Sequence, residues 1–279
     1  MVIKKLRDFG FNTDNRTYII GEIGINHRGD INVAKKLIDS AARSGVDAVK
    51  FQTYITEQRA PKGNDQIFNI LKDLELPFEA FKELKDHTKQ YDIDFFSTPF
   101  DKESVEYLDS IGTDLYKIAS FDVINHKLLR AVAKTGKPVI MSVGMSNLDE
   151  IATAYNILKK GTNSIAILHC ISSYPTIETA SNLSNIYKIQ EQFDCIIGQS
   201  DHTNDIKVPI YAAAAGAQIL EKHFKIDEEF ECIDSQVSIT ELQMHKLIKQ
   251  VRVLEDIFGS ESFGIRKSEE GSEIFRRKQ

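Results

Sequence analysis

Residues 195–224 read CIIGQSDHTNDIKVPIYAAAAGAQILEKHF, and this stretch shows the pattern from which the fold can be predicted. A short apolar run rich in isoleucine ends in polar residues, an alanine-rich segment follows, and a second apolar run again ends in polar residues. Strands that alternate with helical segments in this way predict βα units and a parallel sheet. The alanine run Ala212–Ala215 indicates a helix that packs closely against that sheet.

The same plan repeats along the chain from Thr17 to about Phe224. We expect eight strands, near Tyr18–Ile25, Ala48–Phe51, Phe95–Thr98, Leu115–Ile118, Val139–Ser142, Ile165–His169, Ile196–Gln199 and Gln218–Phe224. Eight strands separated by helical segments predict an α/β fold of the (β/α)8 or TIM barrel type, and 279 residues is a usual length for one.

Helical periodicity fills the intervals between these strands. It is clear over Ile31–Arg43, over Asn147–Lys160 and over the last helix, Thr240–Phe258. The stretch Phe51–Pro77 is longer than a usual connection, so a lid or an extra helix is expected there. The chain divides into three parts: an N-terminal extension (1–16), the barrel (17–258), and a charged C-terminal tail or truncated linker (259–279).

Composition excludes several classes of protein. Hydrophobic residues make up 42% and charged residues 27%, the balance of a globular protein, and no apolar stretch approaches the roughly 18 residues of a membrane span. Three widely spaced cysteines predict neither disulfides nor a cysteine metal motif, so a cytoplasmic location is expected. A net charge of −6 argues against a general nucleic-acid or membrane surface, and any anionic ligand must be held by a local cluster.

Two histidines stand at the ends of neighbouring strands. Because side chains alternate between the faces of a strand, Ser200 shares a face with His202, and Glu221 shares one with His223. A lone histidine is more often structural, but two imidazoles at equivalent positions predict a divalent-metal site that stays open to substrate oxygens. His27 lies on a loop, and we do not assign it as a ligand.

Two lysines, Lys50 and Lys117, end apolar strands, where an unpaired ammonium group would be costly to bury. A phosphate would supply the counter-charge. Hydroxyl donors stand near the same strand ends, at Thr98, Ser120, Ser142, Ser172 and Ser200. Alternatively, each lysine reaches solvent or pairs with Glu22 or Glu221, or one of them forms a Schiff base. Either glutamate could act as a general acid–base or as a salt-bridge partner.

Eight motifs resemble, in this order, the catalytic barrel of sialic acid (N-acetylneuraminate) synthases: GEIGINHRGD, AVKFQTY, FFSTPFD, YKIASFD, PVIMSVGM, LHCISSYPT, IIGQSDHT and ILEKHF. The resemblance extends to relatives that make legionaminic, pseudaminic and spore-coat nonulosonic acids. It covers Tyr18 to about Ser238, most of the chain.

This resemblance implies a transferase that condenses phosphoenolpyruvate with an N-acetylmannosamine-type amino sugar and releases phosphate and a nonulosonic acid. It implies a divalent metal held by His202 and His223, with manganese expected and magnesium or cobalt as alternatives. The matching positions for phosphoenolpyruvate are Lys50, Thr98, Lys117, Ser120, Ser142, Ser172 and Ser200. Those for the amino sugar are Gln52, Asp122, Tyr174 and Asp234, with Glu22 beside the reacting centre. Glu22, Lys50 and Lys117 are thus the expected catalytic residues, in a polysaccharide-biosynthesis enzyme that is a candidate homodimer.

Two departures from the family pattern concern the amino-sugar end. The loop before Asp234 reads Cys232-Ile233-Asp234, where the family usually has Gly-Pro-Asp. The family also usually continues into an antifreeze-like domain that gives an arginine to the partner's sugar site, and this sequence ends at Gln279. Two alternatives follow: a non-catalytic barrel that binds a sugar or a partner, and another phosphoenolpyruvate-dependent sugar acid synthase. A synthase acting on a sugar phosphate would need further arginines, and none stands at the strand ends.

Overall fold

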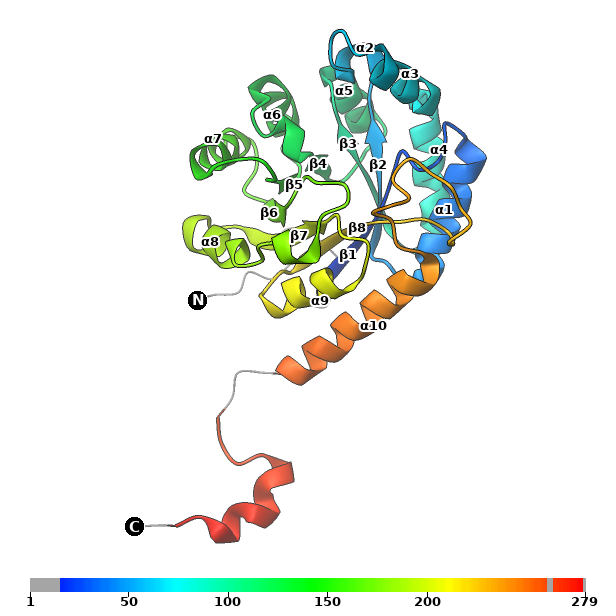
Figure 1. Cartoon of the computed structure of the whole chain (residues 1–279). Coiled ribbons are helices and arrows are strands. Elements are labelled where there is room, and N and C mark those ends of the chain that lie inside the picture. The colour runs from blue at the N-terminus through cyan, green and yellow to red at the C-terminus, as the bar shows by residue number, and fades with distance from the viewer. Residues whose placement is uncertain (1–15, 260–262, 278–279) are drawn as a thin grey trace.

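The structure, a computed structural model, describes residues 16–259 and 263–277 (Figure 1). Eight parallel strands close into a barrel in chain order, with β8 paired to β1. They are β1 (Tyr18–Gly24), β2 (Ala48–Thr53), β3 (Asp94–Pro99), β4 (Tyr116–Ile118), β5 (Val139–Ser142), β6 (Ile165–Cys170), β7 (Ile196–Asp201) and β8 (Ile219–His223). The predicted (β/α)8 barrel and its strands are confirmed, although β7, for example, ends at Asp201 rather than at Gln199.

Helices surround the barrel in a ring (Figure 1). They are α1 (Ile31–Ser44), α4 (Phe78–Thr88), α5 (Lys102–Ser110), α6 (His126–Ala133), α7 (Leu148–Leu158), α8 (Asn185–Gln192), α9 (Lys207–Ala214) and α10 (Glu241–Phe258), with short 3-10 helices η2 (Lys89–Tyr91), η3 (Ser120–Asp122) and η4 (Glu178–Ala180). A further 3-10 helix, η5 (Lys267–Phe275), follows α10 in the chain and is not part of the ring. Asn147 and Thr240 cap α7 and α10 through reciprocal capping boxes. Such caps satisfy N–H groups that would otherwise lack partners at the helix start, which explains where these two helices begin.

The long connection after β2 contains two additional helices, α2 (Thr56–Arg59) and α3 (Asp65–Leu74). Leu71 of α3 packs with Ile25 and Tyr54, and the Tyr54 hydroxyl donates to the Leu71 carbonyl at 2.9 Å. The extra helix expected in this stretch is therefore confirmed. These contacts tie the connection to the C-terminal end of the barrel.

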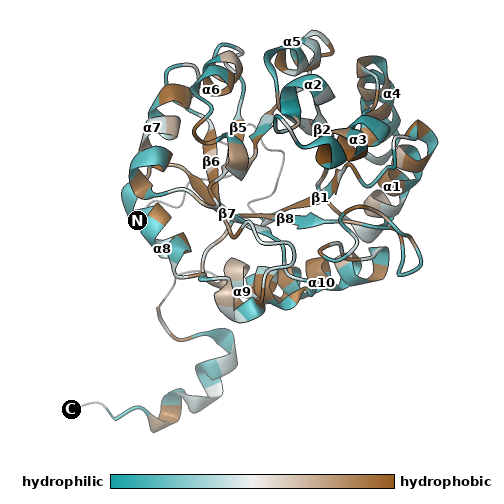
Figure 2. Cartoon of the chain, turned by 45° about the horizontal axis from the view of Figure 1, so that its top comes forward, coloured by the Kyte–Doolittle hydropathy of each residue, from teal (hydrophilic) through white to brown (hydrophobic). Residues whose placement is uncertain are grey.

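Two apolar cores lie on the two sides of the strands. The larger one fills the space between strands and helices, and Figure 2 shows the helices striped around largely hydrophobic strands. The smaller one fills the barrel interior, with Tyr18 and Ile20 of β1 and Ile219 of β8 among its members. Further along each strand the inward positions become polar: Glu22 follows Ile20, and Glu221 follows Ile219. Strand alternation therefore places a polar layer directly above the apolar interior.

A buried ion pair joins β7 to β8 on their outward faces. Lys222 Nζ lies 2.7 Å from Asp201 Oδ2, and Lys222 also donates to the Thr203 carbonyl. The side chains of Lys222 and Asp201 are only 1% and 2% exposed. Removing one partner of such a pair leaves an uncompensated buried charge, whereas removing both does not.

We expect Asp201→Ala to lower the free energy of unfolding by about 3–5 kcal/mol, measured by urea denaturation. The double variant Asp201→Ala, Lys222→Met should recover part of that loss. Asp86→Ala is a matched control, because the Lys82–Asp86 pair has the same 2.7 Å separation on the exposed surface of α4 and should change stability little. Equal losses of unfolding free energy in Asp201→Ala and Asp86→Ala would contradict the explanation that burial makes the Asp201–Lys222 pair important for stability.

The predicted division into extension, barrel and tail stays a prediction at both ends. Residues 1–15 of the extension lie outside the described residues, and all described residues of the tail, including η5, are exposed. Within the ranges that the structure describes, none of the helices combines the length and apolarity needed to cross a membrane.

Candidate active site

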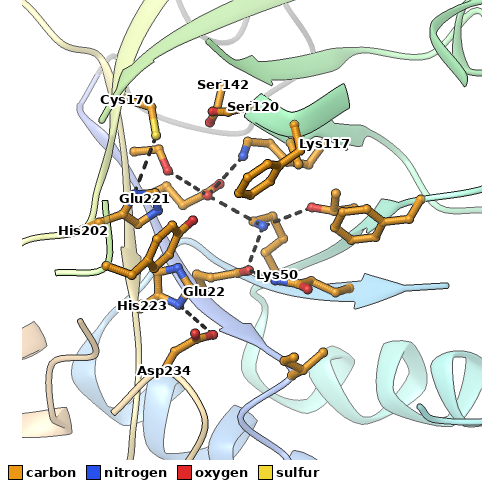
Figure 3. A pocket seen from close by; sticks show the side chains of 18 of the residues that line it. Glu22, Lys50, Lys117, Ser120, Ser142, Cys170, His202, Glu221, His223 and Asp234 are labelled. Atoms are coloured by element: carbon orange, nitrogen blue, oxygen red, sulfur yellow. Dashed lines mark hydrogen bonds and ion pairs between the residues drawn. The ribbon is translucent and has the colours of Figure 1, made fainter. Parts of the chain in front are cut away.

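A cavity of about 270 Å³ opens at the C-terminal ends of the strands. It is lined by most residues that the sequence singled out: Glu22, Lys50, Gln52, Thr98, Lys117, Ser120, Ser142, Tyr174, Ser200, His202, His223 and Asp234 (Figure 3). Most of them occupy the inward positions that continue upward from the apolar interior. Strand alternation thus explains why residues far apart in sequence converge here.

Asp122 and Ser172 do not line this cavity. Asp122 lies on η3, where it accepts a hydrogen bond from Asn125 Nδ2 at 2.8 Å and burial raises the pKa of its carboxyl group. The Ser172 hydroxyl lies 3.9 Å from Cys170 Sγ and so close to Gly144 that a Cβ there would clash with it. Asp122 on η3 and Ser172 after β6 both lie past the ends of their strands, where alternation no longer fixes side-chain direction. Their assignment as substrate-binding residues therefore stays a prediction.

Four charged side chains form one buried network at the floor of the cavity (Figure 3). Lys50 Nζ lies 2.9 Å from Glu22 Oε2 and 3.6 Å from Glu221 Oε1, and Lys117 Nζ lies 3.1 Å from the same Glu221 oxygen. Lys50 also donates to Thr98 Oγ1 at 3.1 Å. Each lysine therefore has a carboxylate within ion-pair distance. Pairing with Glu22 or Glu221 was one of the alternatives that the sequence allowed, besides phosphate binding.

The two lysines keep the Glu221 carboxylate charged despite its burial. Desolvation opposes ionisation of Glu221, but Lys117 and Lys50 outweigh it and lower the pKa of that carboxyl group to about 2. Desolvation also opposes the charge on Lys50, yet Glu22 and Glu221 raise its pKa. Burial lowers the pKa of Lys117, only partly offset by Glu221. Lys117 is thus the lysine with the weaker electrostatic support.

The two strand-end histidines lie side by side in the cavity wall. Their ring centroids are 5.4 Å apart, and the Tyr174 ring lies 4.0 Å from that of His202. His202 Nδ1 lies 2.8 Å from the Ile171 carbonyl oxygen, so Nδ1 donates that hydrogen bond and Nε2 is the nitrogen that could face a metal. His223 Nδ1 lies 3.4 Å from Asp234 Oδ2, and desolvation of Asp234 is outweighed by His223, which lowers the pKa of that carboxyl group.

This donor set fits a divalent metal only as an open site. Two imidazoles are suitable ligands, and second contacts of the kind seen at His202 orient such ligands in metalloproteins. In the part of the chain that the structure describes, no group of three or more His, Cys, Asp or Glu side chains is arranged to hold a metal. A metal between His202 and His223 would therefore need oxygen ligands from substrate or water.

Sequence reasoning missed two polar residues of the cavity, Arg59 and Cys170. Cys170 could have been found, because it shares an inward face of β6 with Leu168. Arg59 stands at the end of α2, in a connection whose path no periodic pattern predicts.

His27 lies outside the cavity lining, consistent with its not being assigned as a ligand. The residue is 1% exposed, its ring stacks on Phe51, and its Nδ1 accepts a hydrogen bond from the Gly29 amide at 3.1 Å. Burial lowers its pKa to about 4. The imidazole is therefore neutral in the folded protein at pH values where it is protonated in the unfolded chain.

A folded-state pKa below the unfolded value predicts that stability falls as the solution becomes more acidic. Below pH 6.5 the unfolded chain binds a proton that folded His27 refuses, so the free energy of unfolding should fall by up to about 3 kcal/mol by pH 4. His27→Asn keeps an acceptor for the Gly29 amide and should show a shallower pH dependence in urea unfolding at pH 7, 6 and 5. Parallel pH profiles for the two proteins would contradict the prediction.

Comparison with known proteins identifies the family. The NeuB family model matches residues 37–263. N,N'-diacetyllegionaminic acid synthase of Campylobacter jejuni is 37% identical over 91% of this chain and 80% of that protein, and N-acetylneuraminate-9-phosphate synthase of Mus musculus is 32% identical over 87% and 71%. The solved sialic acid synthetase of Leptospira borgpetersenii, in complex with citrate, superposes with a TM-score of 0.90 at 38% identity, covering 94% of this chain and 91% of that one.

The family match spans most of the chain, and named synthases are similar to it over most of their own length. The solved relative has the same barrel. The resemblance predicted from the sequence motifs is confirmed: this chain is an enzyme of the NeuB family.

Proposed function

We propose that the protein condenses phosphoenolpyruvate with an N-acetylmannosamine-type amino sugar to give a nonulosonic acid and phosphate. Family membership gives the general reaction, a phosphoenolpyruvate-dependent condensation with an amino sugar. One observation supports the finer assignment most strongly: two buried lysines lie at the floor of a cavity whose wall contains two adjacent imidazoles.

The lysine floor is the proposed site for phosphoenolpyruvate. Lys50 and Lys117 would exchange part of their contact with Glu22 and Glu221 for contact with phosphate and carboxylate oxygens. The hydroxyl of Ser142 is buried without a hydrogen-bond partner among the described residues, so a bound anion would satisfy it. The hydroxyls of Thr98, Ser120 and Ser200 line the same floor.

Formal charge supports a divalent cation at the histidines. Among the described lining residues, three basic side chains face three carboxylates: Lys50, Arg59 and Lys117 against Glu22, Glu221 and Asp234. Phosphoenolpyruvate adds about three negative charges, which a site with no net charge would hold poorly. We therefore propose a divalent ion, with manganese expected, between His202 and His223.

The reaction forms a bond between C3 of phosphoenolpyruvate and the aldehyde carbon of the open-chain sugar. When bound, the metal supplies Lewis acidity at the aldehyde oxygen. Lys50 and Lys117 orient phosphoenolpyruvate and balance its phosphate charge at the floor of the cavity. The enol π electrons form the new carbon–carbon bond, so C2 becomes electron-poor and the aldehyde oxygen becomes an alkoxide. A water adds at C2, and Glu22 takes one of its protons and passes it to the alkoxide. The C2–O bond to phosphate then breaks as the C2 hydroxyl becomes a carbonyl, and its proton leaves with phosphate. Glu22 Oε1 accepts from Gln52 Nε2 at 3.1 Å, which fixes the carboxylate toward the cavity.

The test is turnover of the purified protein with Mn²⁺, phosphoenolpyruvate and a panel of N-acylated mannose-like sugars, followed by phosphate release and product mass. A nonulosonic product is expected, and Glu22→Gln should slow its formation. Phosphoenolpyruvate binding without phosphate release for any acceptor would instead favour the non-catalytic barrel. Borohydride trapping of a lysine adduct would point to Schiff-base chemistry, and activity with phosphorylated sugars alone would point to a sugar-phosphate synthase.

A further inference from the structure

Arg59 gives the cavity a cation that has no carboxylate partner within ion-pair distance among the described residues. Its Nη2 donates to Gln52 Oε1 at 2.7 Å, while its Nη1 is buried without a hydrogen-bond partner in that part of the chain. An unsatisfied buried donor costs free energy and calls for an explanation. Since Arg59 lines the cavity, a ligand there can supply the missing acceptor.

The guanidinium group is held in place before any ligand arrives. Its central carbon lies 4.3 Å from the Tyr54 ring centroid and 4.0 Å from that of Phe100. Two aromatic contacts and the bond to Gln52 restrict the side chain, so little freedom remains to be lost on binding. Arg59 is therefore a preorganised hydrogen-bond donor.

The position of Arg59 assigns it to the end of the cavity where the acceptor sugar is proposed to bind. Gln52 lies beyond Lys50 on β2, toward the cavity mouth, and bridges the two ends: its amide oxygen accepts from Arg59 and its amide nitrogen donates to Glu22. The lysines hold the floor. A group bound by Arg59 thus lies closer to the cavity mouth than the phosphoenolpyruvate site. It is linked to Glu22 through the hydrogen bonds of Gln52.

The chemistry of the donor selects the group it binds. A guanidinium group only donates, so it suits an oxygen that only accepts. In an open-chain N-acylated sugar these are the aldehyde oxygen, which the proposed metal would bind, and the acyl carbonyl oxygen, which is left for Arg59. Charge also favours a neutral oxygen, because Asp234, Asp122 and Glu22 all interact electrostatically with Arg59. A phosphate dianion there would face these three carboxylates.

We propose that Arg59 is a specificity-determining residue that binds the carbonyl oxygen of the acceptor's N-acyl group. The inference rests on the proposed function, because it takes an N-acylated amino sugar as the acceptor. It adds a binding contact supplied from α2 of the same chain. Arg59 discriminates between acceptors, and the lysine floor binds phosphoenolpyruvate independently of it.

The experiment compares paired sugars that differ only at the acyl group, N-acetylmannosamine against mannose and their analogues, in wild type, Arg59→Met and Arg59→Lys. Arg59→Met should weaken binding of the N-acyl sugar about 10–100-fold, the loss of one charge-assisted hydrogen bond, with no comparable change for the 2-hydroxy sugar. The KM for phosphoenolpyruvate should change less than the binding of the N-acyl sugar, because Lys50 and Lys117 remain at the floor. Arg59→Lys should recover only part of the loss, because lysine lacks the planar fork.

Binding measured by calorimetry separates this inference from the proposed reaction. If the N-acyl sugar binds and Arg59→Met removes the acyl preference while no variant turns over, the Arg59 assignment stands and the proposed reaction fails. If wild type binds no N-acyl sugar, or if Arg59→Met weakens both members of a pair equally, the assignment is overturned. A loss confined to phosphorylated sugars would also overturn it. Arg43→Met is the matched control, because Arg43 lies on α1 and pairs with Glu241 at the surface.

Discussion

A Lys117→Met variant is expected to lose about a thousandfold in kcat/KM for phosphoenolpyruvate. Lys117 is 3% exposed and lies 3.1 Å from Glu221 Oε1. Without it, Lys50, 3.6 Å away, would be the lysine left to offset the charge of Glu221 beside the bound anion. A thousandfold loss equals about 4 kcal/mol, a reasonable size for a charged donor that stabilises the transition state in a buried site.

Steady-state kinetics with varied phosphoenolpyruvate and a fixed acceptor will measure that loss. Lys102→Met is the control, because Lys102 lies exposed on α5 and pairs with Glu106. Lys117→Met should also lower stability toward urea, because it leaves the buried charge of Glu221 less compensated. Adding Glu221→Gln should restore that stability without restoring turnover, which separates the effect of charge balance from that of catalysis. A normal KM for phosphoenolpyruvate with an altered KM for the sugar would contradict the role given to Lys117.

The fold and the cavity floor could be predicted because both depend on periodic patterns. The eight apolar runs identified the strands, and the period of two within a strand decided which side chains point inward. Glu22, Lys50 and Ser142 continue the inward positions of β1, β2 and β5, so their convergence followed once the barrel was recognised. Tyr174 and Asp234, on loops, were assigned by family resemblance and also line the cavity.

The rest of the site depends on chain segments without a period. Arg59 reaches the cavity through α2, and neither its position nor its contact with Gln52 is encoded in a strand pattern. Asp122, on η3, and Ser172, after β6, were assigned by family resemblance and do not line the cavity. The partner of Lys50 could not be predicted either. A lysine at a strand end can pair with Glu22, as it does in the structure, or with a phosphate.

His202→Ala and His223→Ala are each expected to reduce turnover by at least about a thousandfold at any Mn²⁺ concentration, because two ligands of one ion act as a unit. The double variant should lose no more than either single variant. Mn²⁺ should raise the Tm of wild type by binding the folded state and should leave both variants unchanged.

His245→Ala is the control for these variants, since His245 lies exposed on α10. A variant that kept the Mn²⁺-dependent rise in Tm would show that the ion binds elsewhere. Losses that multiplied in the double variant would mean that the two imidazoles act separately. His202 would then be explained by its bond to Ile171 and its contact with Tyr174, and His223 by its contact with Asp234. If the two imidazoles acted separately, their free-energy effects would add and the fold losses in turnover would multiply. A double variant that loses no more turnover than either single variant, together with no Mn²⁺-dependent rise in Tm, therefore indicates one shared ion.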